Sequence, residues 1–222
     1  MTDEVLEAFR DEAEALDSVV EKLSADDFRR PTNCPPWDVK ELIVHIAVVL
    51  PPYPLRVADS STPDITEPAD YYRRPDRTRP DYHGGIAARA VETAAEIADG
   101  AAAGRLLAER WRTAWRDWSE RDLSGLVTLS VGTSRLDDYI VTRVISHAAH
   151  GLDLALSLGV EPWTTGRALA VMRPVFVSLL GAEPPTHWSD QALFERATGR
   201  RGLDREDRAA LGACADRWPL LS

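Results

Sequence analysis

Apolar side chains recur at three- and four-residue spacing along much of the chain, and this spacing is typical of amphipathic helices. The clearest example covers residues 3–24, where acidic side chains lie off the apolar stripe. A second segment, residues 42–50, is apolar on all sides except at His45, which predicts a buried helix. Asp38, followed three residues later by Glu41, resembles a capping box at the start of this helix.

Two further long helices are predicted. Residues 86–119 are rich in alanine and carry an apolar helical stripe that Gly100 and Gly104 weaken. Residues 135–158 form the fourth helix, which Gly159 ends. Shorter helices are predicted at residues 165–181, 189–198 and 204–215, a short strand or extended connector at 123–133, and a docked apolar tail at 218–221.

Residues 51–85 contain seven prolines and no sustained period, which predicts a long surface loop. Its tyrosines can cover a pocket as a lid, or the loop can be an ordered excursion without a function. These tyrosines are Tyr53, Tyr71, Tyr72 and Tyr82.

Together these elements predict an all-α fold: a four-helix bundle with a long crossover loop and extra C-terminal helices. We expect the bundle to occupy residues 1–160 and a helical extension, packed on the bundle as one compact unit, to occupy residues 161–222.

Charge and composition exclude several classes of protein. The chain has 26 basic and 36 acidic side chains, a net charge of −10, which argues against a nucleic-acid partner. No apolar run is long enough for a membrane span, and the acidic start lacks the features of a signal peptide. Two cysteines are too few for a disulfide framework, so we expect a cytoplasmic protein. A monomer and a homodimer both remain open.

Three histidines are the candidate metal ligands. His147 and His150 are three residues apart on one predicted helix, so their side chains project to nearly the same side. His45 lies on the buried second helix, where an imidazole needs a partner. Three imidazoles with an open fourth position would form a catalytic metal site. Each histidine can instead be a core residue that is hydrogen-bonded to a carbonyl group.

Other polar residues have more ordinary interpretations. Asp153 can orient a ligating imidazole from behind, or it can be a structural carboxylate. Cys34 is interpreted as a packed structural thiol, because no positive charge that would lower its pKa is evident nearby. His83 and His187 are expected to be solvated.

Two segments carry a family resemblance. Residues 31–42, PTNCPPWDVKEL, followed by His45, resemble the entry to the second helix in the mycothiol-dependent maleylpyruvate isomerase family. Residues 142–155, TRVISHAAHGLDLA, resemble the fourth-helix motif of that family, and residues 194–221 resemble the ending of many members. The family belongs to the DinB-like four-helix metalloenzymes.

The resemblance implies a divalent metal, most often zinc, held by a histidine on the second helix and by a Glu and a His on the fourth. Carried over, these positions are His45, Ser146 and His150. Ser146 departs from the pattern, because serine is a poor zinc ligand. The neighbouring His147 can replace the missing carboxylate after a small helix rotation, or the site has lost a ligand.

In the family, the metal activates a low-molecular-weight thiol, mycothiol. The resemblance therefore implies a metal- and thiol-dependent isomerase or S-transferase that acts on a small electrophile. Arg143, one turn before His147, is the first candidate to bind a carboxylate of the substrate or of the thiol. The alternatives are a non-catalytic bundle that binds a small molecule or a partner through a decayed metal site, and a metal-dependent hydrolase.

Overall fold

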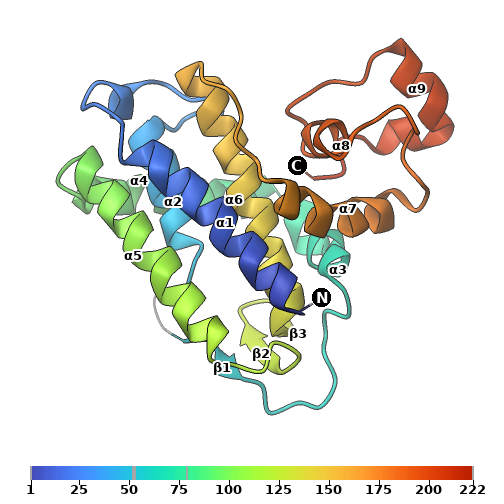
Figure 1. Cartoon of the computed structure of the whole chain (residues 1–222), viewed down its shortest axis with the longest axis horizontal. Coiled ribbons are helices and arrows are strands. Elements are labelled where there is room, and N and C mark those ends of the chain that lie inside the picture. Colours follow the sequence, from blue (N-terminus) through green and yellow to red (C-terminus); the bar gives the residue numbers. More distant parts are fainter. Residues whose placement is uncertain (1, 52–53, 79, 222) are drawn as a thin grey trace.

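Four helices lie side by side in a bundle (Figure 1). They are α1 (Thr2–Val20), α2 (Val39–Val48), α5 (Gly100–Ser119) and α6 (Leu136–Leu158). Helix α1 packs against α5 and α6, and α2 packs against the same two helices. This computed structural model, which describes residues 2–51, 54–78 and 80–221, confirms the predicted all-α bundle.

The start of α2 follows the predicted capping box. The backbone N–H of Glu41 donates to Asp38 Oδ1 at 2.8 Å, and the Asp38 N–H donates to Glu41 Oε2 at 2.9 Å. Both bonds satisfy N–H groups that have no partner inside the helix. A short 3₁₀ helix, η1 (Asp27–Arg29), lies just before this entry.

The prediction of one long helix at residues 86–119 is wrong, because the structure has two helices there. Helix α4 (Pro80–Glu96) ends before Asp99, whose side chain accepts a 2.7 Å hydrogen bond from Ala102 N and caps α5. At Gly100, a Cβ atom would lie 2.1 Å from Phe28 Cγ. The glycine therefore permits the close approach of the Phe28 ring to the start of α5.

The segment predicted as a long loop is also more ordered than expected. It contains a two-residue strand β1 (Arg56–Val57), helix α3 (Pro68–Arg73) and the 3₁₀ helix η2 (Pro75–Thr78), and α4 begins at Pro80. Proline at the first positions of a helix costs no hydrogen bond, which explains why a proline-rich segment can be helical here. Tyr53 lies outside the described residues, as do the side chains of Tyr82 and His83.

A small antiparallel sheet closes one end of the bundle in the order β1-β2-β3. Strand β2 (Leu126–Leu129) pairs with β3 (Gly132–Arg135) in a hairpin, with Leu126 opposite Arg135. Of the two alternatives predicted for residues 123–133, the structure has the short strand, and β1 pairs with its free edge through Arg56 opposite Thr128.

The C-terminal helices lie on the side of the bundle formed by α1 and α6. They are α7 (Gly166–Leu180), α8 (Asp190–Ala197), α9 (Arg205–Leu211) and the 3₁₀ helix η3 (Gly212–Arg217). Helix α7 packs against α1, α3 and α6, and α8 packs against α7. The backbone N–H groups of Leu220 and Leu221 both donate to Ala197 O at 2.9 Å, so the apolar tail docks as predicted.

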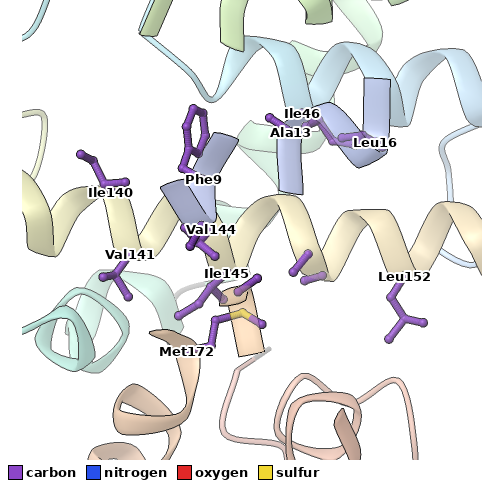
Figure 2. Packing of buried hydrophobic residues seen from close by; sticks show 14 of the residues in the cluster. Phe9, Ala13, Leu16, Ile46, Ile140, Val141, Val144, Ile145, Leu152 and Met172 are labelled. Atoms are coloured by element: carbon purple, nitrogen blue, oxygen red, sulfur yellow. The ribbon is translucent and has the colours of Figure 1, made fainter. Parts of the chain in front are cut away.

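The core lies between the bundle helices and extends towards α7. Figure 2 shows Phe9 of α1 next to Val144 of α6, with Leu16 further along α1 and Met172 of α7 on the opposite side of α6. All four of these side chains are fully buried. Their burial from water is the main stabilising contribution to the arrangement that positions the cavity described below. Among the described residues, no helix combines the length and the hydropathy that crossing a bilayer requires.

Candidate functional site

A cavity of about 350 Å³ opens between α2, α6 and the segment that contains α3. Residues of the Cys34–Trp37 turn, of α4 and of the C-terminal segment complete its wall. Its lining includes Cys34, Trp37, His45, Tyr71, Tyr72, Arg77, Arg143, Ser146, His150, Thr198, Arg200 and Leu221. This volume can hold a small ligand together with water.

His45 and His150 meet in this cavity. Their Nε2 atoms are 3.2 Å apart, and their rings are nearly perpendicular with centroids 4.8 Å apart. Trp37 stacks on His45 at a centroid distance of 4.5 Å. Burial, followed by the neighbouring His150 and Arg143, lowers the pKa of His45 to about 2, so the ring is neutral at physiological pH. A neutral imidazole is the form that ligates a metal.

The spacing of the two Nε2 atoms fits a shared metal ion. Two nitrogen ligands at about 2.0–2.1 Å from a tetrahedral zinc ion lie roughly 3.3 Å apart, close to the observed separation. The His45 Nδ1 atom has no hydrogen-bond partner in the described structure. The pair therefore offers two nitrogen atoms at a spacing that suits a shared metal ion.

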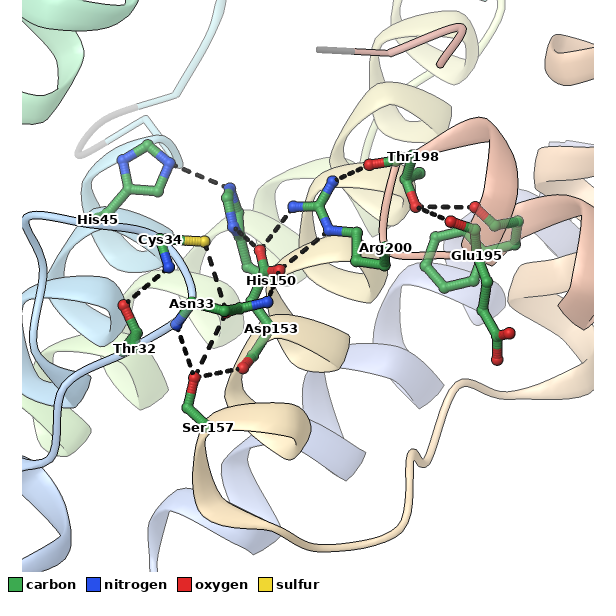
Figure 3. A network of polar contacts seen from close by, with 11 residues as sticks. Thr32, Asn33, Cys34, His45, His150, Asp153, Ser157, Glu195, Thr198 and Arg200 are labelled. Atoms are coloured by element: carbon green, nitrogen blue, oxygen red, sulfur yellow. Dashed lines mark hydrogen bonds and ion pairs between the residues drawn. The ribbon is translucent and has the colours of Figure 1, made fainter. Parts of the chain in front are cut away.

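Asp153 lies behind His150 and fixes its ring (Figure 3). The His150 Nδ1–H donates to Asp153 Oδ2 at 3.1 Å, which leaves Nε2 facing His45. Asn33 Nδ2 and the guanidinium group of Arg200 also donate to this carboxylate. Burial alone would raise the pKa of Asp153, but the bonds from His150 and Arg200 outweigh it and lower the pKa. A carboxylate in this position fixes the tautomer of a ligating imidazole.

Cys34 lies within 4.8 Å of ligand atoms of His150 and Asp153. These three side chains could in principle hold a metal, but the Asp153 oxygens already accept hydrogen bonds from Asn33, His150 and Arg200. Burial, then the charge of Asp153, raises the pKa of the Cys34 thiol to about 12. Cys34 is therefore a neutral thiol in the cavity wall and a poor nucleophile.

His147 does not join the other two histidines. It is fully buried on the side of α6 that faces α1, where its ring packs edge-on against Phe9 at a centroid distance of 5.1 Å. Its Nδ1 atom lies 3.0 Å from Arg143 O, and Nε2 has no partner in the described structure. Side chains three residues apart on a helix point in directions that differ by about 60°. This difference is enough for His147 to face the core while His150 faces the cavity. Ser146 lines the cavity instead.

Arg143 lies in the same cavity, 7% exposed. Its guanidinium group donates to Thr142 Oγ1 at 3.2 Å, to Val49 O at 3.4 Å and to the Tyr71 hydroxyl at 3.3 Å. It also lies over the rings of Tyr71 and Tyr139. None of these partners is an anion, so the cavity presents a buried positive charge that a ligand can neutralise.

Sequence reasoning did not identify Arg200 or Asn33 as site residues. Arg200 is 47 residues from Asp153 and Asn33 is 120 residues from it, so no local spacing connects them. Tyr71 and Tyr72 were predicted only as residues of a lid, and both line the cavity. His187 lies elsewhere, 43% exposed, with Nε2 3.4 Å from Asp207.

Comparison with known proteins gives one family and a common fold. The family profile described as "Mycothiol maleylpyruvate isomerase N-terminal domain" matches residues 9–155. A crystal structure of the mycothiol-dependent maleylpyruvate isomerase superposes with a TM-score of 0.50 at 16% identity, covering 83% of this chain and 74% of that one. A histidine-to-alanine mutant of that isomerase gives 0.49 at 15% identity over the same shares. No curated protein sequence matches significantly.

Proposed function

Because this chain belongs to the mycothiol maleylpyruvate isomerase N-terminal domain family, we propose that it is a metal-dependent enzyme that uses a low-molecular-weight thiol. Its reaction would be isomerisation or S-transfer on a small electrophilic substrate, with mycothiol or a similar thiol as cosubstrate. The observation that carries this proposal is the His45–His150 pair, 3.2 Å apart in a cavity that also contains Arg143.

In this proposal His45 and His150 hold a divalent metal, with zinc as the first choice. When bound, such a metal favours the thiolate form of a coordinating thiol and holds its sulfur near the electrophile. Asp153, supported by Arg200, keeps the His150 Nε2 atom directed at this position. Trp37 covers the other face of His45 and limits the access of water to it.

Arg143 would bind and orient a carboxylate of the substrate or of the thiol. Arg143 and His150 are seven residues apart on α6, which is about 10 Å along the helix axis. A ligand that reaches both ends must therefore be extended. This arrangement suits a small acid whose electrophilic carbon lies at the histidine end and whose carboxylate lies at the arginine end.

Residues 161–222 complete the site in this proposal, because Thr198, Arg200 and Leu221 line the cavity. We treat them as a helical extension of the bundle at residues 1–160. We further propose a cytoplasmic protein with no nucleic-acid or membrane partner, which functions as a monomer or a homodimer.

Metal analysis of the purified protein tests the proposal most directly. We expect near-stoichiometric zinc or another divalent metal, lost in both His45→Ala and His150→Ala. His147→Ala serves as the matched control, because its ring packs against Phe9 and not in the cavity. Metal content that stays far below stoichiometric after zinc addition, or that disappears only in His147→Ala, would overturn this assignment.

Ser146 favours a second candidate function, a protein that binds a ligand without catalysis. Ser146 lines the cavity at the position where the family motif carries a glutamate, and it is a weak metal ligand. A bundle without catalysis, which binds a small acid at a decayed metal site, would be consistent with this serine. Turnover of unsaturated acids and of their esters, with and without added thiol, separates the three cases. Thiol-dependent turnover of the acid supports our proposal, thiol-independent hydrolysis of the ester indicates a hydrolase, and binding without turnover indicates the non-catalytic protein.

A further inference from the structure

Tyr71 has a hydroxyl group with an unused proton in the cavity wall. The oxygen accepts a 3.3 Å hydrogen bond from Arg143 Nη2. No acceptor for the Tyr71 hydroxyl proton lies within hydrogen-bond distance among the described residues. The neighbouring Tyr72 differs, because its hydroxyl donates to the backbone oxygen of Thr142 at 3.3 Å. A half-buried donor without an acceptor is a group that a ligand can use.

Positive charge surrounds Tyr71. The guanidinium carbons of Arg74, Arg77 and Arg143 lie 4.6, 5.6 and 5.5 Å from the centre of its ring. Tyr72, on the same helix, packs edge-on against Tyr71. Tyr139 of α6 also contacts this arginine, since its ring centre lies 5.1 Å from the guanidinium carbon of Arg143.

This environment changes the acidity of Tyr71. Burial alone would raise its pKa, but the charges of Arg143, Arg77 and Arg74 outweigh burial and lower the pKa to about 8. At neutral pH the phenol therefore keeps its proton and is a stronger hydrogen-bond donor than an ordinary tyrosine. Next to this phenol, Arg143 provides a positive charge that no carboxylate of the described residues neutralises.

We propose that Tyr71 and Arg143 form a binding site for one anionic oxygen of a small carboxylate ligand, with Tyr71 donating its phenolic proton to that oxygen. The inference rests on the proposed function in one respect, namely that the carboxylate ligand is the substrate. The site would select anionic over neutral ligands and would place a carboxylate at the α3 end of the cavity, away from His45 and His150.

The proposal has a definite pH dependence. A ligand that accepts the phenolic proton binds only the protonated form of Tyr71, so binding raises the Tyr71 pKa above its value of about 8 in the free protein. Affinity is then constant below that pKa and falls about tenfold for each pH unit above it, until the pKa of the complex is reached. His45, in the same cavity, has a pKa of about 2 and does not contribute in this range.

Calorimetric binding of fumarate to the full-length protein as purified tests this inference. We expect its dissociation constant to begin rising near pH 8. Tyr71→Phe should bind fumarate about fivefold or more weakly below this pH and should show no break, because the donor is absent. The uncharged analogue fumaramide should bind much more weakly than fumarate.

Two variants control for indirect effects. Tyr72→Phe removes a hydroxyl that is already donated to Thr142 O, so fumarate binding should keep its break near pH 8. Arg143→Lys retains the charge but not the planar donor group, and it should weaken binding while moving the break to higher pH. An unchanged break in Tyr71→Phe, or equal binding of fumarate and fumaramide, would overturn the proposal.

These results are independent of catalysis. A protein without metal or thiol-dependent turnover, but with a fumarate affinity that Tyr71 controls, would refute the proposed function and retain the anion site. Thiol-dependent turnover together with pH-independent fumarate binding would retain the function and refute the site.

Discussion

Arg200 holds Asp153 with two parallel hydrogen bonds, from Nε to Oδ1 at 3.0 Å and from Nη2 to Oδ2 at 2.6 Å. Its Nη1 atom donates to Thr198 O at 2.6 Å, so the backbone of the C-terminal segment fixes the guanidinium group in turn. The Asp153 carboxylate is 1% exposed and also accepts from His150. The orientation of a cavity histidine thus depends on a residue outside the bundle.

Replacement of Arg200 should weaken metal binding without removing a ligand. We expect Arg200→Gln to lower the affinity for zinc about tenfold or more, as is typical when a partner behind a ligating histidine is lost. Competition with a chromogenic chelator measures this affinity. Arg201→Gln is the matched control, because Arg201 is 57% exposed and pairs with Glu195. Equal zinc affinities of the two variants would contradict the role assigned to Arg200.

Restoring the carboxylate of the family motif should strengthen the site. Ser146 lines the cavity four residues before His150, so Ser146→Glu places an acidic ligand one helical turn away. We expect zinc affinity to rise at least tenfold in the same competition assay. Ser146→Gln has nearly the same shape without the charge and should give little of this increase. A glutamate variant that binds zinc no better than the glutamine variant would rule out this position as a ligand.

Glu12 should make the stability of the fold depend on pH. The side chain is 1% exposed, Thr165 N donates to Oε2 at 3.0 Å, and Oε1 has no partner. Burial raises its pKa from 4.5 to about 7, so the folded state holds this proton more tightly than the unfolded state. This contribution is fully present below pH 4.5 and is lost as the pH rises to about 7.

Glu12→Gln removes this titration. The variant should be more stable than the unmodified protein above pH 7, by about 1–3 kcal/mol, and the difference should shrink below pH 4.5. Urea unfolding at both pH values measures it. Glu14→Gln, with a side chain that is 56% exposed, should show no such pH-dependent difference. A constant difference across this range would mean that Glu12 is charged in the folded protein.

The packing of Phe28 against the start of α5 should depend on the absence of a side chain at Gly100. A methyl group there would overlap the Phe28 ring, so Gly100→Ala should lower the free energy of unfolding by about 1–3 kcal/mol. Gly85, within α4, has nothing near the corresponding position, so Gly85→Ala should be neutral or slightly stabilising. Thermal or urea unfolding of the two variants compares them, and a neutral Gly100→Ala would show that Phe28 moves aside at little cost.

The bundle could be predicted from the sequence because helical periodicity and capping are local. The Asp38–Glu41 box and the apolar run around His45 both form as expected. The break at Asp99 carries a local signal, the aspartate cap followed by Gly100, whereas the close approach of Phe28 to this glycine comes from a residue that is distant in the chain. The helix in the proline-rich segment was missed because proline is unfavourable inside a helix but favourable at its start.

The site could be predicted only in part for a similar reason. The spacing of His147 and His150 predicts that both lie on nearly the same face of α6. Their directions differ by about 60°, however, and this difference places His150 in the cavity and His147 in the core. Which side of α6 faces the core depends on how the helices pack, and His147 lies on the side that contacts Phe9 of α1. Arg200 could not be found from spacing, since its contact with Asp153 exists only after the C-terminal segment docks.

The contact between Arg200 and Asp153 can form only late in synthesis of the chain. Asn33, His45 and His150 leave the ribosome well before Arg200 does. Until Arg200 arrives, Asp153 can accept only from Asn33 and His150 and lacks the two bonds from the guanidinium group. A nascent chain can therefore have a folded bundle while the cavity still lacks the part of its wall that Thr198, Arg200 and Leu221 form.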